Sequence, residues 1–301
     1  MREAVRAGQA GGAPAADPTQ QGALWRGLRR VLRHRGAMVG GTIVLALVLV
    51  ALLAPVLSPY DPYKNDLARI ARPPGPGHLL GTDELGRDML TRLMYGARLS
   101  LLVGVTSVGL ALVAGTAVGA VSGYLGGWLD LLTMRVIDIM LAFPSTLLAI
   151  AITAILGPSL TNAVVAVAIV NVPIYARLVR SSVLSIRELE YVEAARAAGM
   201  PTARVIWRHV LPGALAPLIV QSTMSIGSAI LEVAGLSFLG LGAAPPAAEW
   251  GAMLSRAREF LQTAPWVVTF PGMAIMLAVL GFNLLGDGLR DLLDPRLRHR
   301  G

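Results

Sequence analysis

The 301-residue chain contains no cysteine and a single lysine, Lys64, and only 15% of its residues are charged. Without thiols, the chain can form neither disulfides nor thiolate metal sites. Its four histidines lie far apart in the sequence, so no two of them have the helical spacing of a metal-binding pair. The sequence therefore predicts no metal site.

Several signatures of catalysis are missing as well. A P-loop needs a Gly-Lys dipeptide, and the chain has none; the patterns H-E-x-x-H and G-x-S-x-G are also absent. An intramembrane aspartyl site would need two neighbouring acids. The candidates, Asp138 and Glu232, are expected near opposite faces of the membrane. The sequence therefore predicts no catalytic residues and no ATPase site in this chain.

Apolar residues, in contrast, make up 54% of the chain, and the mean hydropathy is +0.63. A helix needs about 20 apolar residues to cross the hydrocarbon core of a bilayer. Six segments meet this requirement, at residues 38–57, 99–123, 132–156, 161–179, 213–234 and 266–286. The predicted fold is all-α, a polytopic integral membrane protein with six transmembrane helices.

The net charge of +8 comes almost entirely from arginine. The arginines cluster beside apolar segments, as the positive-inside rule predicts, so we interpret them as membrane topology signals and expect no nucleic-acid partner. Arginines in 26–35, in 180–212 and in the C-terminal tail agree on one orientation. Both termini and the loop 180–212 are predicted to be cytosolic.

The remaining segments complete the predicted organisation. Residues 1–23 have a composition typical of disorder, and 24–37 form either an amphipathic helix on the lipid surface or a basic stop before the first span. Residues 58–98 are external, with 83–98 either loop or interfacial helix. The transmembrane core spans 99–286, and 287–301 form a cytosolic tail.

Residues 188–199 are predicted to form a short amphipathic helix within the cytosolic loop. The side chains at spacings i, i+3, i+4 and i+7 form a small apolar face that another backbone can approach closely. That face consists of Tyr191, Ala194, Ala195 and Ala198. Connecting loops can also be helical by chance, so a partner-binding role does not follow from this pattern alone.

Four further residues define the shape of this loop. Gly199 stands where a left-handed residue ends a helix, Pro201 suits the start of a second short helix, and Pro212 opens the next span. Glu193 and Arg196 are three residues apart, so they can pair. The predicted arrangement is helix, sharp turn, helix and membrane span.

Two other groups of residues are candidates for a role in gating or anchoring. Glycines near the end of the fifth span permit a tight turn, which indicates an external gate or a plain loop exit. The gate candidates are Glu232, Ser237, Phe238 and Gly240. Arg135 and Asp138 are predicted to pair as a structural anchor, and Pro144 to kink the third span.

Glu193-Ala194-Ala195, followed by Gly199 and then Leu211-Pro212, resembles the EAA motif of bacterial ABC-importer permeases. Only His209 departs from it, because the general motif favours isoleucine there. The resemblance implies that Glu193, Ala194, Ala195, Gly199, Leu211 and Pro212 belong to a coupling loop. In that family the coupling loop docks into a groove of a cytosolic ATPase.

Three further segments narrow the branch of the family. The run from Gly81 to Asp88, the run from Asp138 to Pro144 and the run from Leu236 to Gly242 are similar to those of dipeptide, oligopeptide and nickel permeases of the C type. This resemblance implies a type I ABC importer fold in a bacterial inner or plasma membrane. The chain would form half of the translocation path.

The resemblance also implies the partners of the chain, which are a second homologous permease, two ATPase subunits, an extracytoplasmic solute-binding protein and the lipid membrane. ATP and Mg²⁺ would be used by the ATPases, and this chain would bind no cofactor. Dipeptides, oligopeptides, glutathione-like peptides and nickel chelates all remain open as substrates. The alternatives are an intramembrane enzyme and an ion-coupled secondary transporter; the latter is disfavoured because no charge is expected near the middle of a span.

Overall fold

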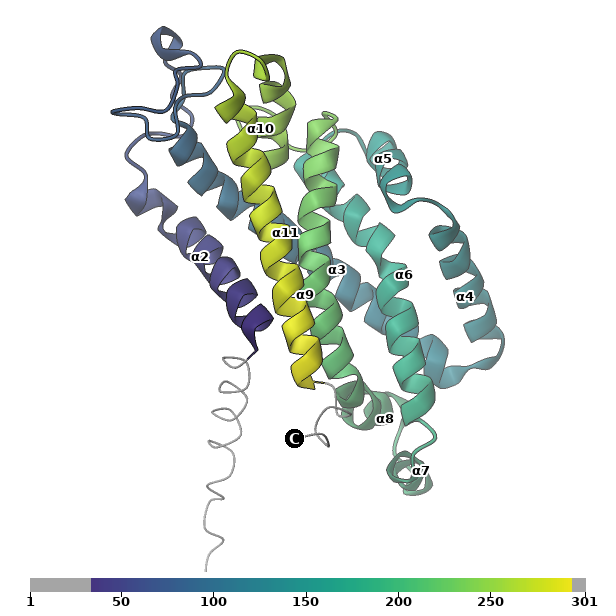
Figure 1. Ribbon diagram of the computed structural model, residues 1–301. Helices are drawn as coiled ribbons and strands as arrows, with labels where there is room; N and C mark the ends of the chain where they lie inside the picture. Colours follow the sequence, from purple (N-terminus) through teal and green to yellow (C-terminus); the bar gives the residue numbers. More distant parts are fainter. Residues whose placement is uncertain (1–33, 294–301) are drawn as a thin grey trace, which may run out of the picture.

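A computed structural model describes residues 34–293, and every regular element in that range is a helix. Figure 1 shows an elongated bundle whose long helices run side by side between two ends capped by short elements. Five helices are long and apolar enough to cross a membrane, and a bent pair of helices passes the same test when the two are taken together. The predicted all-α, polytopic membrane fold is confirmed. The predicted tail 1–23, most of 24–37 and residues 294–301 lie outside the described range.

The long helices and the bent pair form the body of the bundle. They are α2 (Arg35–Leu57), α3 (Met89–Leu125), α4 (Gly127–Ala142), α5 (Ser145–Leu156), α6 (Leu160–Ile186), α9 (Leu211–Phe238) and α11 (Pro265–Leu293). Short elements lie at the two ends. They are η1 (Leu67–Arg69), α7 (Glu190–Ala197), α8 (Thr202–Val205), η2 (Ile206–Val210), α10 (Trp250–Ala257) and η3 (Arg258–Phe260).

Several helices extend beyond the apolar segments read from the sequence. Helix α3 starts at Met89, ten residues before the predicted span, because the Asp88 carboxylate accepts a hydrogen bond from the Thr91 backbone N–H (2.8 Å) and caps the helix. At the other end of the bundle, α6 continues to Ile186 and α11 to Leu293. Hydropathy marks only the apolar part of a helix, so it misses these polar extensions.

The third predicted span, 132–156, is broken into two helices. Helices α4 and α5 meet at Phe143-Pro144 with a bend of 97°. Proline has no backbone N–H and its ring clashes with the carbonyl four residues earlier, which disfavours a continuous helix. The predicted kink at Pro144 is therefore a complete break in the helix.

Helix α3 lies at the centre of the bundle, behind α6 and α9 in Figure 1. Gly115, Gly119 and Gly123, spaced four residues apart, let α3 approach α6 closely. A Cβ on Gly119 would lie 2.3 Å from the carbonyl oxygen of Ala176. Small residues at this spacing are typical of close helix packing in membranes, where van der Waals contact drives association.

The two ends of the bundle differ in content. Helices α7 and α8 lie at the same end as the start of α2 and the end of α11, whereas residues 58–88 and α10 lie at the opposite end (Figure 1). The predicted topology requires this, because it places loop 180–212 and both termini on one side of the membrane. We refer to the end that carries α7 as cytosolic and to the other as external.

Candidate functional site

The turn after α7 has the conformation that the sequence predicts. Gly199 has φ of +77°, and a Cβ added there would meet no atom within 4 Å. The Met200 N–H donates to the Ala195 carbonyl (3.1 Å) and the Gly199 N–H to the Arg196 carbonyl (2.9 Å), which closes the helix end. Glycine is favoured here by the left-handed backbone and not by a shortage of space.

The second half of the loop runs into the membrane helix without a break. Helix α8 passes into η2, a π-helical turn, and η2 passes into α9. Pro212 explains the wide turn, because it cannot donate a hydrogen bond to the carbonyl of Arg208 and its ring would crowd that group in a regular α-helix. Residues from Thr202 onward are therefore a rigid extension of α9.

The loop is anchored to the bundle by buried aliphatic side chains. Val192, Ala195, Val205 and Val210 are buried, and the three valines belong to the same apolar cluster as Val183 of α6. The small apolar face predicted for α7 is thus divided. Its member Ala195 faces the bundle and is 8% exposed.

The other members of that face point away from the protein. Ala194, Ala198 and Tyr191 are exposed, and so is the neighbouring Glu193. Within residues 34–293, the Glu193 carboxylate forms no salt bridge. The result is an exposed ridge of small side chains with one acid, of the kind that a protein groove can receive.

Arg196 has a different partner from the one predicted. Its Nε donates to the Tyr124 hydroxyl (2.9 Å), and its guanidinium lies over the Tyr124 ring, 4.7 Å from the centroid. The predicted pair with Glu193 is therefore wrong. Arg187 also reaches α3, where it donates to the Gly123 carbonyl (2.8 Å). Both arginines fasten the loop to the cytosolic end of α3, a contact that only the tertiary structure reveals.

His209, the one departure from the general motif, lies beside Tyr191. The two rings are 6.4 Å apart, and the Tyr191 hydroxyl donates to the His209 backbone carbonyl (3.3 Å). The contact joins α7 to η2 across the turn. An aromatic ring at position 209 thus helps to fix the angle between the two halves of the loop.

The structure separates the four gate candidates into two groups. Ser237, Phe238 and Gly240 form the turn at the external end of α9, where the buried Ser237 hydroxyl accepts a hydrogen bond from the Ala243 N–H (3.1 Å). Gly240 has φ of +80°. Glu232 lies further back in α9, where its carboxylate accepts a hydrogen bond from the Asn171 amide of α6 (3.1 Å).

The predicted structural pair is also corrected. Asp138 of α4 forms a salt bridge with Arg177 of α6 and not with Arg135. A second salt bridge joins the same two helices, from Arg180 to Asp130 (2.5 Å). Arg177 is 39 residues from Asp138 along the chain, so sequence spacing favours the neighbour Arg135 over the true partner.

The Arg177–Asp138 pair lies inside its two helices. Arg177 is nine residues before the end of α6, and Asp138 is eleven residues after the start of α4. Arg177 is also near the end of the predicted span 161–179, because α6 continues past that span as a polar extension.

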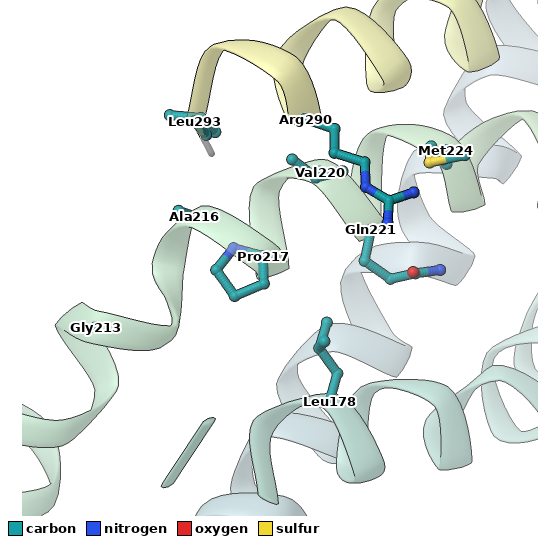
Figure 2. A pocket seen from close by; sticks show the side chains of 9 residues that line it. All are labelled: Leu178, Gly213, Ala216, Pro217, Val220, Gln221, Met224, Arg290 and Leu293. Carbon is teal, nitrogen blue, oxygen red and sulfur yellow. The ribbon is translucent and has the colours of Figure 1, made fainter. Parts of the chain in front are cut away.

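A cavity of about 460 Å³ opens between α6, α9 and α11 near their cytosolic ends. Figure 2 shows the Arg290 side chain of α11 extending toward Gln221 of α9, with Leu178 of α6 on the opposite wall. Most of the lining is apolar, including Pro217 and Met224. The cavity therefore combines the Arg290 guanidinium group and the Gln221 amide with a mostly apolar wall.

At the external end, residues 58–88 and 239–264 pack together as an outer cap. Asp83, Arg87 and Asp88 of the motif Gly81–Asp88 are buried here, and the charged side chains are paired. Arg87 bridges Asp83 (2.7 Å) and Glu84 (2.6 Å), and Arg92 contacts Asp83 (3.1 Å) and donates to the Pro62 carbonyl (2.9 Å). The motif is a structural network, which sequence reasoning did not identify.

Two tryptophans also belong to the contacts of the outer cap. Trp250 is buried, and its Nε1 donates to the Leu93 carbonyl (3.2 Å); the Trp266 Nε1 donates to the Thr82 carbonyl (3.3 Å). Tryptophan is enriched at membrane interfaces, but these two rings join the cap to α3 and α11. They act as packing residues within the protein.

Comparison with known proteins supports this description. Residues 115–299 match the family profile "Binding-protein-dependent transport system inner membrane component", and residues 23–74 match "N-terminal TM domain of oligopeptide transport permease C". The first match covers more than half of the chain.

Curated relatives are similar over nearly their whole length. The dipeptide transport system permease protein DppC of Alkalihalophilus pseudofirmus is 54% identical over 91% of this chain and 90% of its own. The di/tripeptide permease DppC of Pseudomonas aeruginosa is 48% identical over 95% of this chain and 97% of its own length. The glutathione permease GsiD of Pectobacterium atrosepticum is 48% identical over 91% of this chain and 92% of its own length.

Among solved structures, an inward-facing form of the MetNI methionine ABC transporter matches with a TM-score of 0.55 at 21% identity. The match covers 68% of this chain and 98% of the other, and it supports the fold. The chain belongs to the binding-protein-dependent transport system inner membrane components, as a multi-pass permease subunit of an ABC importer.

Proposed function

We propose that this permease imports di- or oligopeptides, or a related small solute, together with a second homologous permease. The observation that carries the proposal is the exposed ridge of α7, which is linked through a rigid turn to α9, in a chain whose relatives are named as dipeptide and glutathione permeases. A solute-binding protein would deliver the substrate to the external end.

The energy would come from ATP and Mg²⁺ bound by two ATPase subunits and not by this chain. In this mechanism, the ridge formed by Glu193, Ala194 and Ala198 docks into a groove on one ATPase. Closure of the ATPase pair then pushes on α7. Because α8 and η2 continue directly into α9, the push tilts α9, and Arg196 passes part of it to α3 through Tyr124.

The external turn Ser237–Gly240 would act as the gate at the other end of α9. A tilt of α9 moves this turn, because the turn is formed by the last residues of α9 and the residues that follow directly. The buried hydrogen bond between Ser237 and Ala243 makes the turn stiff, so it would move as one body with the helix. The outer cap beside it would receive the binding protein.

The test uses the complete transporter reconstituted in liposomes. Glu193→Lys reverses the charge of the ridge, and Gly199→Asp places a side chain in a left-handed turn. We expect both variants to insert and assemble, and to lose ATP-driven uptake by at least tenfold. Asp287→Lys is the control, because Asp287 is an exposed acid on α11 outside the loop. Normal uptake by Glu193→Lys and Gly199→Asp would overturn the coupling role.

A further inference from the structure

The salt bridge between Asp138 and Arg177 lies inside two of the apolar segments that are predicted to cross the membrane, 132–156 and 161–179. At 1.5 Å per residue, Arg177 is about 14 Å from the cytosolic end of α6, and Asp138 is about 17 Å from the start of α4. Both side chains are nonetheless about half exposed, at 52% for Arg177 and 49% for Asp138. An ion pair with this exposure inside two apolar segments needs a polar environment.

Lipid cannot provide that environment. A charged side chain near the centre of a bilayer costs about 2.5 to 3.5 kcal/mol even on the mildest scale, and such residues face protein or a water-filled cavity. The exposed side of the ion pair therefore faces water or another polar group.

The exposed residues of α6 mark one open face of that helix, which the buried Asn171 borders on one side. With 3.6 residues per turn, Asn171 and Leu178 point in nearly the same direction, and Arg177 points about 120° away. Between these directions lie Ile174 and Ser181, both of which are exposed. Asn171, at one edge, bonds Glu232 of α9, and Arg177, at the other edge, bonds Asp138 of α4.

We propose that this face lines the translocation path and that the Arg177–Asp138 pair contacts the charged termini of the peptide in transit. Arg177 would bind the C-terminal carboxylate and Asp138 the N-terminal ammonium group. This inference rests on the proposed function and names the residues of the path that recognise its substrate class.

The neighbouring salt bridge shows why this pair is suited to bind a ligand. Arg180 and Asp130 form two hydrogen bonds, so both carboxylate oxygens are used, and they are more buried, at 31% and 16%. Arg177 donates to one oxygen of Asp138 only. The second oxygen and most of the guanidinium N–H groups are left for another partner.

A zwitterionic peptide supplies both of the missing partners. Its carboxylate can accept from the free guanidinium N–H groups, and its ammonium group can donate to the free oxygen of Asp138. Each new charge-assisted hydrogen bond is stronger than a neutral one but can be exchanged for water. Such a contact would favour free peptide termini without depending on the side chains of the peptide.

The experiment measures ATP-driven uptake in the reconstituted transporter with three labelled probes, namely dialanine, dialanine amide and N-acetyl dialanine. Each probe is supplied at a concentration that saturates the same binding protein, so any change in preference between variants arises in the permease. We expect Arg177→Gln to reduce the preference for dialanine over its amide about tenfold. Asp138→Asn should reduce the preference over N-acetyl dialanine by a similar factor.

Asp130→Asn and Arg180→Gln are the matched controls, because they break the other salt bridge between the same two helices. They should lower thermal stability and leave both preferences unchanged. Unchanged preferences in both test variants would overturn the proposal, and so would equal changes in the controls, which would indicate a structural effect. Each test variant addresses one preference, so one variant still tests the proposal if the other fails to assemble. Absence of uptake by the unmodified transporter would instead count against the proposed function.

Discussion

The two ends of the bundle differ in whether their charged side chains are buried or exposed. In the outer cap, Asp83, Arg87 and Arg92 are each at most 2% exposed, and both arginines form a salt bridge with Asp83. In the coupling loop, Glu193 is exposed without a salt bridge among the described residues, and Arg196 holds an exposed contact with Tyr124. The outer cap pairs its charged side chains internally, whereas the loop that carries α7 presents them outward.

This difference separates stability from function. A buried charge without its partner costs several kcal/mol, so the outer cap is constrained by its own network. An exposed charge contributes little to folding, so the residue types of the coupling ridge are explained better by a partner than by the fold. The following predictions measure that contrast directly, from the largest expected effect to the smallest.

Arg87→Ala should be the most damaging change, because it leaves the buried Asp83 carboxylate and the partly buried Glu84 carboxylate without their main partner. We expect a loss of about 3 to 5 kcal/mol in the free energy of unfolding. Thermal unfolding followed by tryptophan fluorescence reports this directly. Arg69→Ala is the control, because its salt bridge with Asp66 is exposed and should contribute less than about 1 kcal/mol. Equal losses in the two variants would contradict the proposed role of burial.

Glu249→Ala should have the next largest effect. The Glu249 carboxylate caps α10 by accepting hydrogen bonds from the Gly251 and Ala252 N–H groups (2.9 and 2.8 Å), so its removal should cost about 1 to 2 kcal/mol. Burial, opposed by these hydrogen bonds, raises the pKa of Glu249 above its ordinary value of 4.5.

The raised pKa of Glu249 predicts a pH dependence. As pH rises above about 4.5, the unfolded state loses the proton first, so the free energy of unfolding contributed by Glu249 falls until the raised pKa is passed. Glu249→Gln should keep the cap and remove this slope. The measurement is the melting temperature of the unmodified protein and of Glu249→Gln between pH 4 and 8. Parallel curves would refute the predicted pH dependence.

Gly199→Ala should lower the free energy of unfolding by about 1 to 2 kcal/mol, because alanine must adopt the left-handed conformation at φ +77°. No steric term adds to this cost, since the space around Gly199 is open. Gly272→Ala in α11 is the matched control, with equally open space and no positive φ. The control should be as stable as the unmodified protein or slightly more so.

Glu193→Lys should change the free energy of unfolding by no more than about 0.5 kcal/mol, since Glu193 is exposed and away from the packed core. Its effect on transport, in contrast, should be large. A melting temperature that falls as far as that of Arg87→Ala would place Glu193 among the structural residues and remove the contrast between the two ends.

Much of the fold could be predicted from composition and pattern. Hydropathy located the crossings, arginine distribution predicted which loops share a side, and Gly199 and Pro144 marked a turn and a helix break. These signals are local, because each depends on the residue itself or on its immediate neighbours. The resemblance to the EAA motif predicted a coupling role for the loop that carries α7 for the same reason, as its residues lie within one short stretch.

The two wrong salt bridges concern long-range contacts. The predicted pairs of Glu193 with Arg196 and of Arg135 with Asp138 follow helical spacing, but Arg196 bonds Tyr124 and Asp138 bonds Arg177. Spacing shows which residues can meet on one helix. It cannot show that a second helix brings a better partner to the same place.

The sequence alone determined that this protein is a helical membrane protein, since the length and apolarity of its segments leave a bilayer as the only solvent that suits them. It also determined the backbone of the coupling turn, because only glycine adopts that conformation without strain. The tertiary structure decided which charges are buried in the outer cap and which ion pair stays half exposed within the membrane. Those outcomes depend on the close approach of α3, α4 and α6, and a helix crossing is set by packing between surfaces that are distant in the chain.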